Sequence, residues 1–212
     1  MFQNRSDAGK QLAERLRQYK GANAVVLALP RGGVVVGYEV ARLLGLPLDI
    51  VAARKIGHPQ HPEYAICATD EKGTLLCNEV EAELVDQDWL SGEIEQQKKE
   101  VARRIKVYRG GKKSTQVTNK VAIIVDDGIA TGLTMRLAIK AVKEQKPDRI
   151  IIAVPVAPSD TVREIRREAD EIIVLEPPKD FMGAIGAHYQ EFEQVEDEEV
   201  IRLLQSAYGA GN

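Results

Sequence analysis

The sequence predicts an α/β fold, a doubly wound and mostly parallel sheet within a single domain of residues 1–212. Short apolar runs alternate along the chain with stretches of helical periodicity, the order typical of a parallel sheet covered by helices on both faces. The apolar runs are continuous, as expected for strands buried on both sides. A length of 212 residues with 44% hydrophobic and 29% charged residues fits one globular domain, although two small ones are also possible.

The first half of the chain begins this alternation. The expected elements are a helix over 6–19 capped by Ser6 or Asp7, a strand over 24–29, a helix over 32–44 and a strand over 48–52. A hairpin of residues 64–69 with residues 74–78 would follow. These assignments place the first two parallel strands early in the chain, each followed by polar residues.

The second half contains the remaining strands and two departures from the alternation. Strands are expected over 121–125, 149–154 and 171–175, with helices between them. Residues 82–110 form a helical insertion of one or two amphipathic helices and a polar linker, which would act as a dimer contact, a lid, or a solvated helix packed on its own domain. Residues 176–195 are rich in turn-forming residues and are expected to form a small C-terminal hood.

Charge and cysteine content narrow the classes of function. The balance of 29 basic and 32 acidic residues gives a net charge of -3, which argues against a dedicated nucleic-acid binder. No apolar run approaches the roughly 20 residues of a membrane span, and no signal peptide is evident, so we expect a cytoplasmic protein without membrane or nucleic-acid partners. Cys67 and Cys77 could lie opposite one another in the hairpin, but in a reducing cytosol we expect two small apolar fillers.

The most informative segment is residues 121–134, in which an apolar strand ends in two carboxylates and a loop of small and hydroxylated residues leads into a helix. Asp126 and Asp127 can accept hydrogen bonds from two neighbouring hydroxyl groups. The loop leaves backbone N–H groups uncovered at a helix N-terminus, where an anion is favoured. A plain strand end with a capped helix is the alternative, but the whole segment favours a ribose 5-phosphate site.

This segment resembles the signature of the type I phosphoribosyltransferases, which use 5-phosphoribosyl 1-pyrophosphate (PRPP). The resemblance implies that Asp126 and Asp127 hold the ribose hydroxyls and support Mg²⁺, with Asp127 also a candidate for proton transfer. It further implies that the 5-phosphate is bound by the loop that follows, made of Gly128, Ile129, Ala130, Thr131, Gly132, Leu133 and Thr134.

Two further segments resemble the pyrophosphate end of such a site. Arg31, Gly32 and Gly33 follow the first strand and are similar to the pyrophosphate loop of xanthine-type members, so the Arg31–Gly32 bond is a candidate for a cis peptide; the alternative is a plain turn with Arg31 in solvent. Arg54 and Lys55 follow the second strand and resemble the pair that meets pyrophosphate in orotate-type members, which makes Lys55 a second catalytic candidate.

Residues 56–74 occupy the position of the family's flexible catalytic loop, which closes over the site and keeps out water. His58 and His61 in this stretch would either donate to departing pyrophosphate or simply be solvated. The hood resembles the base-binding segment of hypoxanthine–guanine-type members, which suggests Phe181 and Met182 as base contacts; the alternative for Phe181 is a core side chain that anchors the loop.

The sequence departs from the 6-oxopurine members at three places. Ala130 replaces their general-base Asp, residues 153–158 lack their base-reading Lys, and His188 stands where an acid helps to hold Mg²⁺. The sequence therefore does not identify the acceptor base.

Taken together, the expected function is Mg²⁺-dependent transfer of ribose 5-phosphate from PRPP to a nitrogenous base, with release of pyrophosphate, by a homodimer that serves nucleotide salvage. A PRPP-binding regulatory protein without catalytic activity is the rival. A dinucleotide-dependent oxidoreductase is weaker, because Gly32, Gly33 and Gly37 break the GxGxxG spacing.

Overall fold

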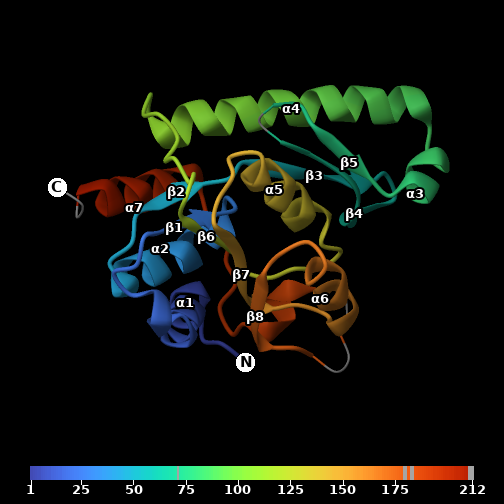
Figure 1. The fold of residues 1–212 in the computed structure, drawn as a ribbon. Helices are drawn as coiled ribbons and strands as arrows, with labels where there is room; N and C mark the ends of the chain where they lie inside the picture. The colour runs from blue at the N-terminus through green and yellow to red at the C-terminus, as the bar shows by residue number, and fades with distance from the viewer. Residues whose placement is uncertain (71, 179–180, 182–183, 210–212) are drawn as a thin grey trace.

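The computed structural model describes residues 1–70, 72–178, 181 and 184–209. Its centre is a five-stranded parallel sheet in the order β2-β1-β6-β7-β8, which confirms the predicted fold class (Figure 1). The strands are β1 (Ala24–Ala28), β2 (Leu48–Ile50), β6 (Val121–Val125), β7 (Arg149–Val156) and β8 (Glu171–Glu176). The expected strands therefore exist with their limits within two residues of prediction.

Helices cover both faces of this sheet. Because successive side chains of a strand point to opposite faces, they are buried in two different cores. Val26 and Ile123 face the core shared with the first group of helices, whereas Leu27 and Ile124 face the other core. The first group is α1 (Arg5–Arg15), α2 (Gly32–Leu44) and α7 (Asp197–Gly209), and the second is α5 (Leu133–Lys143) and α6 (Ser159–Ile165). Two layers of helices thus hold the sheet between them.

The first helix differs from its prediction. It begins at Arg5, with the side chain of Asn4 accepting a hydrogen bond from the Asp7 N–H, so neither Ser6 nor Asp7 is the N-cap. It ends at Arg15, and a short 3₁₀ turn (Arg17–Tyr19) follows. The observed start places a cation, Arg5, in the first turn of the helix.

A second sheet stands beside the first. It is antiparallel, in the order β3-β4-β5, with β3 (Ala53–His58), β4 (His61–Asp70) and β5 (Leu75–Cys77). The predicted hairpin of residues 64–69 with residues 74–78 is confirmed as β4 and β5. Most of residues 56–74 pair as strands, and closure of this stretch over the site stays a prediction. The predicted helical insertion is confirmed as α3 (Glu79–Glu83) and α4 (Gln87–Arg109), and α4 lies along the second sheet (Figure 1).

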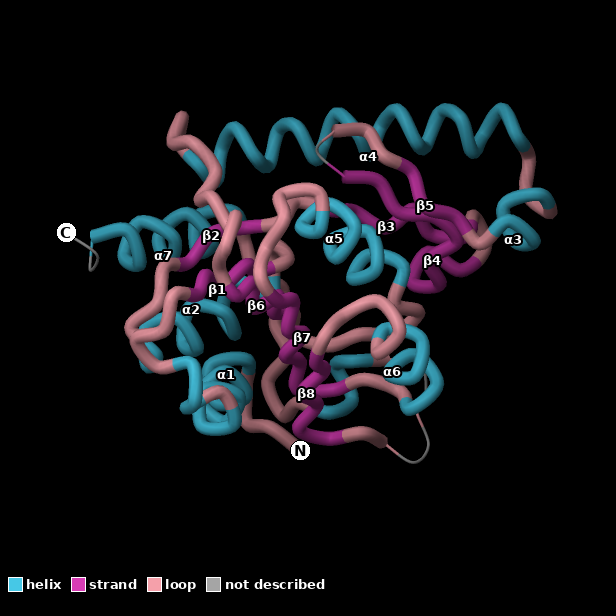
Figure 2. Tube along the Cα trace, in the orientation of Figure 1, coloured by secondary structure: helices cyan, strands magenta, loops and turns pink. Residues whose placement is uncertain are grey.

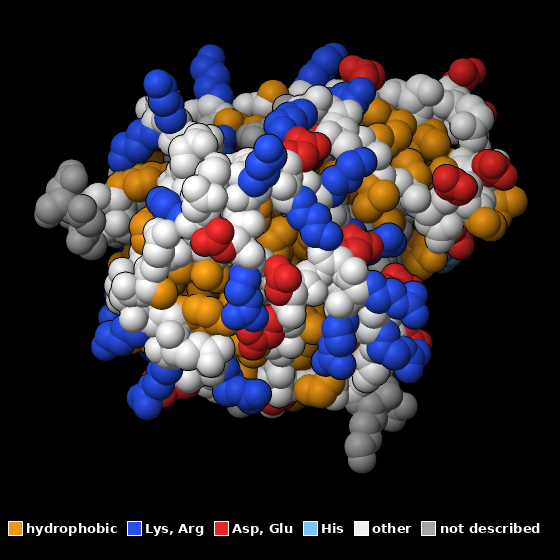
Figure 3. Space-filling model, in the orientation of Figure 1, with side chains coloured by type: hydrophobic (Ala, Val, Ile, Leu, Met, Phe, Trp, Pro, Cys, Tyr) orange, Lys and Arg blue, Asp and Glu red, His pale blue; other side chains and the backbone are white. Residues whose placement is uncertain are grey.

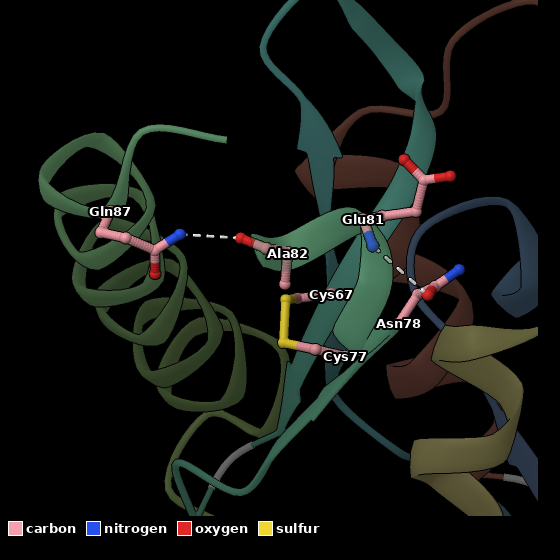
Figure 4. Close-up of a disulfide and its surroundings, with 6 residues drawn as sticks. All are labelled: Cys67, Cys77, Asn78, Glu81, Ala82 and Gln87. Carbon is pink, nitrogen blue, oxygen red and sulfur yellow. Dashed lines mark hydrogen bonds between the residues drawn. A yellow bond between two sulfur atoms is a disulfide. The ribbon is translucent and has the colours of Figure 1, made fainter. Parts of the chain in front are cut away.

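Cys67 and Cys77 form a disulfide that ties β4 to β5, so the expectation of two separate apolar fillers is wrong (Figure 4). The strand register pairs these residues directly, with their Cα atoms 4.0 Å apart. Cys67 is fully buried in a small cluster with Ile56, Ile66 and Leu90. The bond therefore fastens the second sheet at the point where its core meets α4.

Every helix in the described residues is too short or too polar to cross a membrane.

The disulfide should stabilise the fold because it closes a loop of residues 67–77 in the unfolded chain and so lowers the conformational entropy of the unfolded state. We expect reduction, or the Cys67→Ser/Cys77→Ser double substitution, to lower the free energy of unfolding by about 2–3 kcal/mol. Urea unfolding with and without dithiothreitol measures this. The double variant is the control, since reductant should leave it unchanged. Equal stability of the oxidised and reduced wild-type protein would contradict the prediction.

Candidate functional site

The loops after β1, β6 and β7 meet at one edge of the main sheet, because the carboxyl ends of parallel strands lie together. Two backbone hydrogen bonds extend the strands into this edge, from Leu29 N to Val125 O at 3.0 Å and from Ile129 N to Val156 O at 2.9 Å. Figure 2 shows loops at the ends of these strands. The predicted acid pair, phosphate loop and Arg31 loop thus share one rim.

The acid pair lies against the backbone of the Arg31 loop. Asp126 Oδ1 accepts a hydrogen bond from the Asp127 N–H at 2.8 Å. A Cβ atom at Gly32 would stand 2.0 Å from Asp127 Oδ2, and one at Gly33 would stand 2.8 Å from Asp126 Oδ1. Both positions therefore require glycine for close approach, and the two motifs form a single structure.

Arg5 is a site residue that the sequence reasoning missed. Its Nε donates to Asp127 Oδ2 at 2.6 Å, its Nη1 donates to Glu193 O at 2.7 Å, and its guanidinium lies 3.7 Å from the ring centroid of Phe192. Both partners of the ion pair are well covered, with side chains 12% and 15% exposed. A cation in the first turn of a helix opposes the helix dipole, but the predicted start at residue 6 left Arg5 outside the helix, and its partner Asp127 is 122 residues away in sequence.

The C-terminal segment holds the other side of Asp127. The Tyr189 hydroxyl donates to the Asp127 carbonyl at 2.6 Å, and Tyr189 in turn forms a β-bridge with Phe2. The N-terminal residues and residues 188–193 are joined by further backbone hydrogen bonds, such as Gln190 N to Phe2 O at 2.9 Å. Two segments far apart in sequence therefore fix the acid pair together.

This environment changes the acid–base behaviour of Asp126 and Tyr189. Burial raises the pKa of Asp126 well above its ordinary value, and the charge of Asp127 raises it further. Burial, followed by the Asp127 charge, also raises the pKa of the Tyr189 phenol. Of the two carboxyl groups, Asp126 is the one with the raised pKa, while Asp127 contacts Arg5.

The predicted phosphate loop divides into buried and accessible parts. Ile129 and Leu133 are buried in the core under α5, so they can offer a ligand only their backbone groups, whereas Thr131 and Thr134 are partly exposed. Gly132 is the N-cap residue of α5, with a left-handed φ of 81° and no side-chain hydrogen bond to the helix. An uncapped helix N-terminus with hydroxyl groups beside it is suited to an anion.

The Arg31 loop holds a cis peptide, but at Pro30–Arg31 and not at the predicted Arg31–Gly32 bond. The Arg31 side chain is not free in solvent, since its Nη1 lies 3.3 Å from Glu196 Oε2 and 3.8 Å from Asp197 Oδ1. These acids stand at the start of α7. The loop is thus attached to the helix layer behind it.

Arg54 and Lys55 occupy opposite faces of β3, so the structure does not bring them together as a pair. Arg54 lies toward α4, with Nη1 3.2 Å from Glu100 Oε1. Lys55 shares a face with Ala53, which packs in the core under α5. His58 and His61 stack at the hairpin tip, where His61 is exposed. The tip is about 13 Å along the strand from Arg54, which favours the solvated alternative for both histidines.

The hood contacts the phosphate loop through Ile185, whose Cγ2 is 2.5 Å from the Cβ position of Gly128. Phe181 is half-buried, packs against the cluster of Phe2 and Tyr189, and stacks on His188 with ring centroids 6.1 Å apart. This fits the alternative of an anchoring side chain as well as a base contact. Met182, the other predicted base contact, lies outside the described residues.

The acid pair suits Mg²⁺ by its chemistry. Two carboxylates supply hard oxygen donors, and Mg²⁺ in such sites takes its other ligands from substrate phosphates and water. No group of three or more His, Cys, Asp or Glu side chains that could hold a metal occurs among the residues the structure describes. Asp126 and Asp127 would therefore hold the ion only together with a phosphorylated ligand.

A hollow of about 560 Å³ lies elsewhere, at the amino end of β2 between α2 and α7. Tyr38, Leu46 and Tyr208 are among its lining residues. It stands at the opposite edge from the acid pair, so we do not place the site there.

The chain is similar to known proteins in both sequence and structure. A profile of the phosphoribosyl transferase domain matches residues 3–191. Two Mycobacterium tuberculosis proteins, from strains CDC 1551 and H37Rv and each named "Putative phosphoribosyl transferase", are 40% identical over 210 residues, 98% of this chain and 47% of each relative. The crystal structure of TT1426 from Thermus thermophilus aligns with a TM-score of 0.78 at 39% identity, covering 97% of this chain and 98% of that one. The chain spans about half the length of the curated relatives it matches.

The raised pKa of Asp126 predicts a pH-dependent stability. The folded state retains a proton that the unfolded carboxyl loses near pH 4, so the free energy of unfolding should fall as pH rises from about 4 through the folded pKa. One such proton gives a slope of at most about 1.4 kcal/mol per pH unit. Asp126→Asn should lack this slope in urea unfolding measured at a series of pH values. Parallel pH curves for variant and wild type would refute the assignment.

Arg5 should contribute to stability through its covered ion pair. We expect Arg5→Gln to lower the free energy of unfolding by about 1–3 kcal/mol, because it leaves Asp127 without its charged donor. Arg163→Gln is the matched control, since Arg163 pairs with Asp160 in full exposure, at 71% and 83%, and should change stability by less than about 0.5 kcal/mol. Thermal and urea unfolding compare them, and similar losses in both variants would count against the role of Arg5.

Proposed function

The chain belongs to the phosphoribosyl transferase family, and from this premise we propose that it transfers the ribose 5-phosphate of PRPP to a nitrogenous base, with release of pyrophosphate. The order of groups along the rim carries the proposal. Arginines follow β2 and β1, the acid pair follows β6, and the phosphate loop lies between β6 and β7. The same order, from pyrophosphate through the ribose hydroxyls to the 5-phosphate, is found in PRPP.

Each group has a defined part in the proposed reaction. Asp126 and Asp127 accept hydrogen bonds from the ribose hydroxyls, and the amides and hydroxyls of Gly128–Thr134 bind the 5-phosphate. The bond from ribose C1 to the pyrophosphate oxygen breaks, and its electron pair leaves with the pyrophosphate. The base nitrogen then bonds to C1 and loses its proton, for which Asp127 is the candidate acceptor. Lys55 is a proposed partner of the departing charge.

Mg²⁺ is proposed as the cofactor, with Asp126 and Asp127 as the protein groups that would hold it. When bound, it supplies positive charge that offsets the charge of the pyrophosphate. Burial raises the pKa of Asp126, so at a pH below that raised pKa metal binding should be accompanied by release of a proton.

The acceptor base, the homodimer and a role in nucleotide salvage in the cytoplasm are parts of the same proposal. Phe181 is the described hood residue that we assign to the base, since a flat heterocycle can stack on an aromatic ring. The relatives are about twice as long as this chain. Any activity of the whole protein is therefore also a proposal. A PRPP sensor would have the same rim, and turnover separates the two functions.

The test is release of pyrophosphate from PRPP with Mg²⁺ and a panel of purines, pyrimidines and other nitrogen heterocycles. We expect turnover with at least one base, and at least a hundredfold loss in the Asp126→Asn/Asp127→Asn variant, because mutation of a group that stabilises developing charge costs on the order of 10²–10³ in rate. Asp160→Asn, an exposed aspartate of α6, is the matched control and should remain active.

Two results would overturn the enzymatic proposal. PRPP binding without pyrophosphate release from any base would indicate a sensor. Unchanged turnover in the double variant would remove the acid pair from the site.

A further inference from the structure

Glu100 of α4 is the meeting point of three arginines from two elements. Arg54 Nη1 and Arg104 Nε approach the same oxygen, Oε1, at 3.2 Å and 2.9 Å. Arg103 binds both oxygens, with Nε 2.7 Å from Oε2 and Nη2 3.0 Å from Oε1. One carboxylate oxygen therefore sits between a guanidinium from the second sheet and one from the helix above it.

Asp197 continues this network to the rim. It accepts from Arg103 Nη2 at 2.7 Å and from the Tyr108 hydroxyl, and it lies 3.8 Å from Arg31 Nη1. Arg31, Arg54, Arg103 and Arg104 thus share three carboxylates, those of Glu100, Asp197 and Glu196. The two arginines expected at the pyrophosphate end are therefore both paired with internal carboxylates.

The arginines are crowded and partly covered. The Arg104 side chain is 12% exposed and that of Arg54 is 28% exposed, while other lysines and arginines lie on the outer surface along α4 (Figure 3). Burial lowers the pKa of Arg54, and the nearby charges of Arg104 and Arg31 lower it further. Neighbouring cations that repel one another are favoured only when an anion lies between them.

A buried hydroxyl lies next to Arg54. Thr69 is directly opposite Arg54 on β4, so both side chains are on the same face of the second sheet. Thr69 is fully buried, and its Oγ1 has no hydrogen-bond partner among the residues the structure describes. A buried hydroxyl without a partner is unusual, and it could donate to a phosphate oxygen held by Arg54.

We propose that Arg54 and Arg104 form one binding site for the pyrophosphate group, and that Glu100 occupies this site until the pyrophosphate displaces it. The inference rests on the proposed function and adds α4, an insertion outside the main sheet, to the substrate site. A pyrophosphate oxygen can take the position of Glu100 Oε1 because guanidinium groups bind carboxylate and phosphate with the same geometry. The greater charge of pyrophosphate favours the exchange.

The experiment is calorimetric titration of inorganic pyrophosphate, of PRPP and of ribose 5-phosphate into the wild type and the variants Arg104→Gln, Arg104→Lys and Glu100→Gln. Arg104→Gln should weaken pyrophosphate and PRPP about tenfold, the loss expected for a hydrogen bond to a charged group. Ribose 5-phosphate, which has no pyrophosphate group, should bind as before. Arg104→Lys keeps the charge and should recover part of the loss.

Glu100→Gln decides between displacement and a structural role. Removal of the competing anion should tighten pyrophosphate binding severalfold, whereas a residue that only orders the arginines would weaken binding when replaced. Glu95→Gln is the matched control on the same helix, since Glu95 pairs only with Lys98 in the described residues and should leave affinity unchanged. Thermal unfolding of each variant confirms that it is folded.

The outcomes separate this inference from the proposed function. If the wild type binds neither PRPP nor pyrophosphate, both fail. If the wild type binds PRPP, but Arg104→Gln binds pyrophosphate equally well or Glu100→Gln binds it no better, the role of α4 is overturned and the proposed function stands. Loss of ribose 5-phosphate binding in Arg104→Gln would also overturn it, because the effect would then be general.

Discussion

The ion pair between Arg5 and Asp127 is the contact on which the rim depends. It joins the first turn of α1 to the carboxyl end of β6, and Gly32 packs directly against it. Phe192 covers the guanidinium from the hood. Four segments of the chain therefore converge on one carboxylate, and the close approach of the Arg31 loop to the acid pair is possible only because glycine occupies both contact positions.

Local sequence was sufficient for the main sheet and for the acid pair. Five apolar runs bounded by turn residues correspond to the five parallel strands, because a strand buried on both faces must be continuously apolar. The adjacency of Asp126, Asp127 and Gly32 follows from the same rule, since parallel strands end at one edge. Arg5 could not be found in this way. Its role depends on the N-terminal residues pairing with Tyr189, a contact between distant segments that no local pattern indicates.

The errors have a common origin in assumptions about context. Residues 56–74 contain glycine, prolines and histidines and suggested a loop, yet pairing with β3 and packing against α4 and α5 hold most of them in strands. The cysteines were expected to be separate because a reducing compartment was assumed, whereas the hairpin register places them opposite one another. Pairing and packing between segments decided the first case, where local propensity alone was a poor guide, whereas the second depended on a local hairpin register that the sequence had already indicated.

The resting rim is neutralised by its own residues. Asp127 is paired with Arg5, Arg31 with the acids at the start of α7, and Arg54 with Glu100. A charged substrate must therefore exchange its contacts for these internal ones, and its affinity reflects only the difference between the two sets. Such pairing gives the half-buried charges partners when no ligand is bound. An unpaired charge in a covered site would destabilise the fold. It also favours a ligand that carries several negative charges, because only such a ligand offers the arginines more than the carboxylates already do. Under the proposed function, this arrangement of charges would favour a substrate with several phosphate groups before any base is recognised.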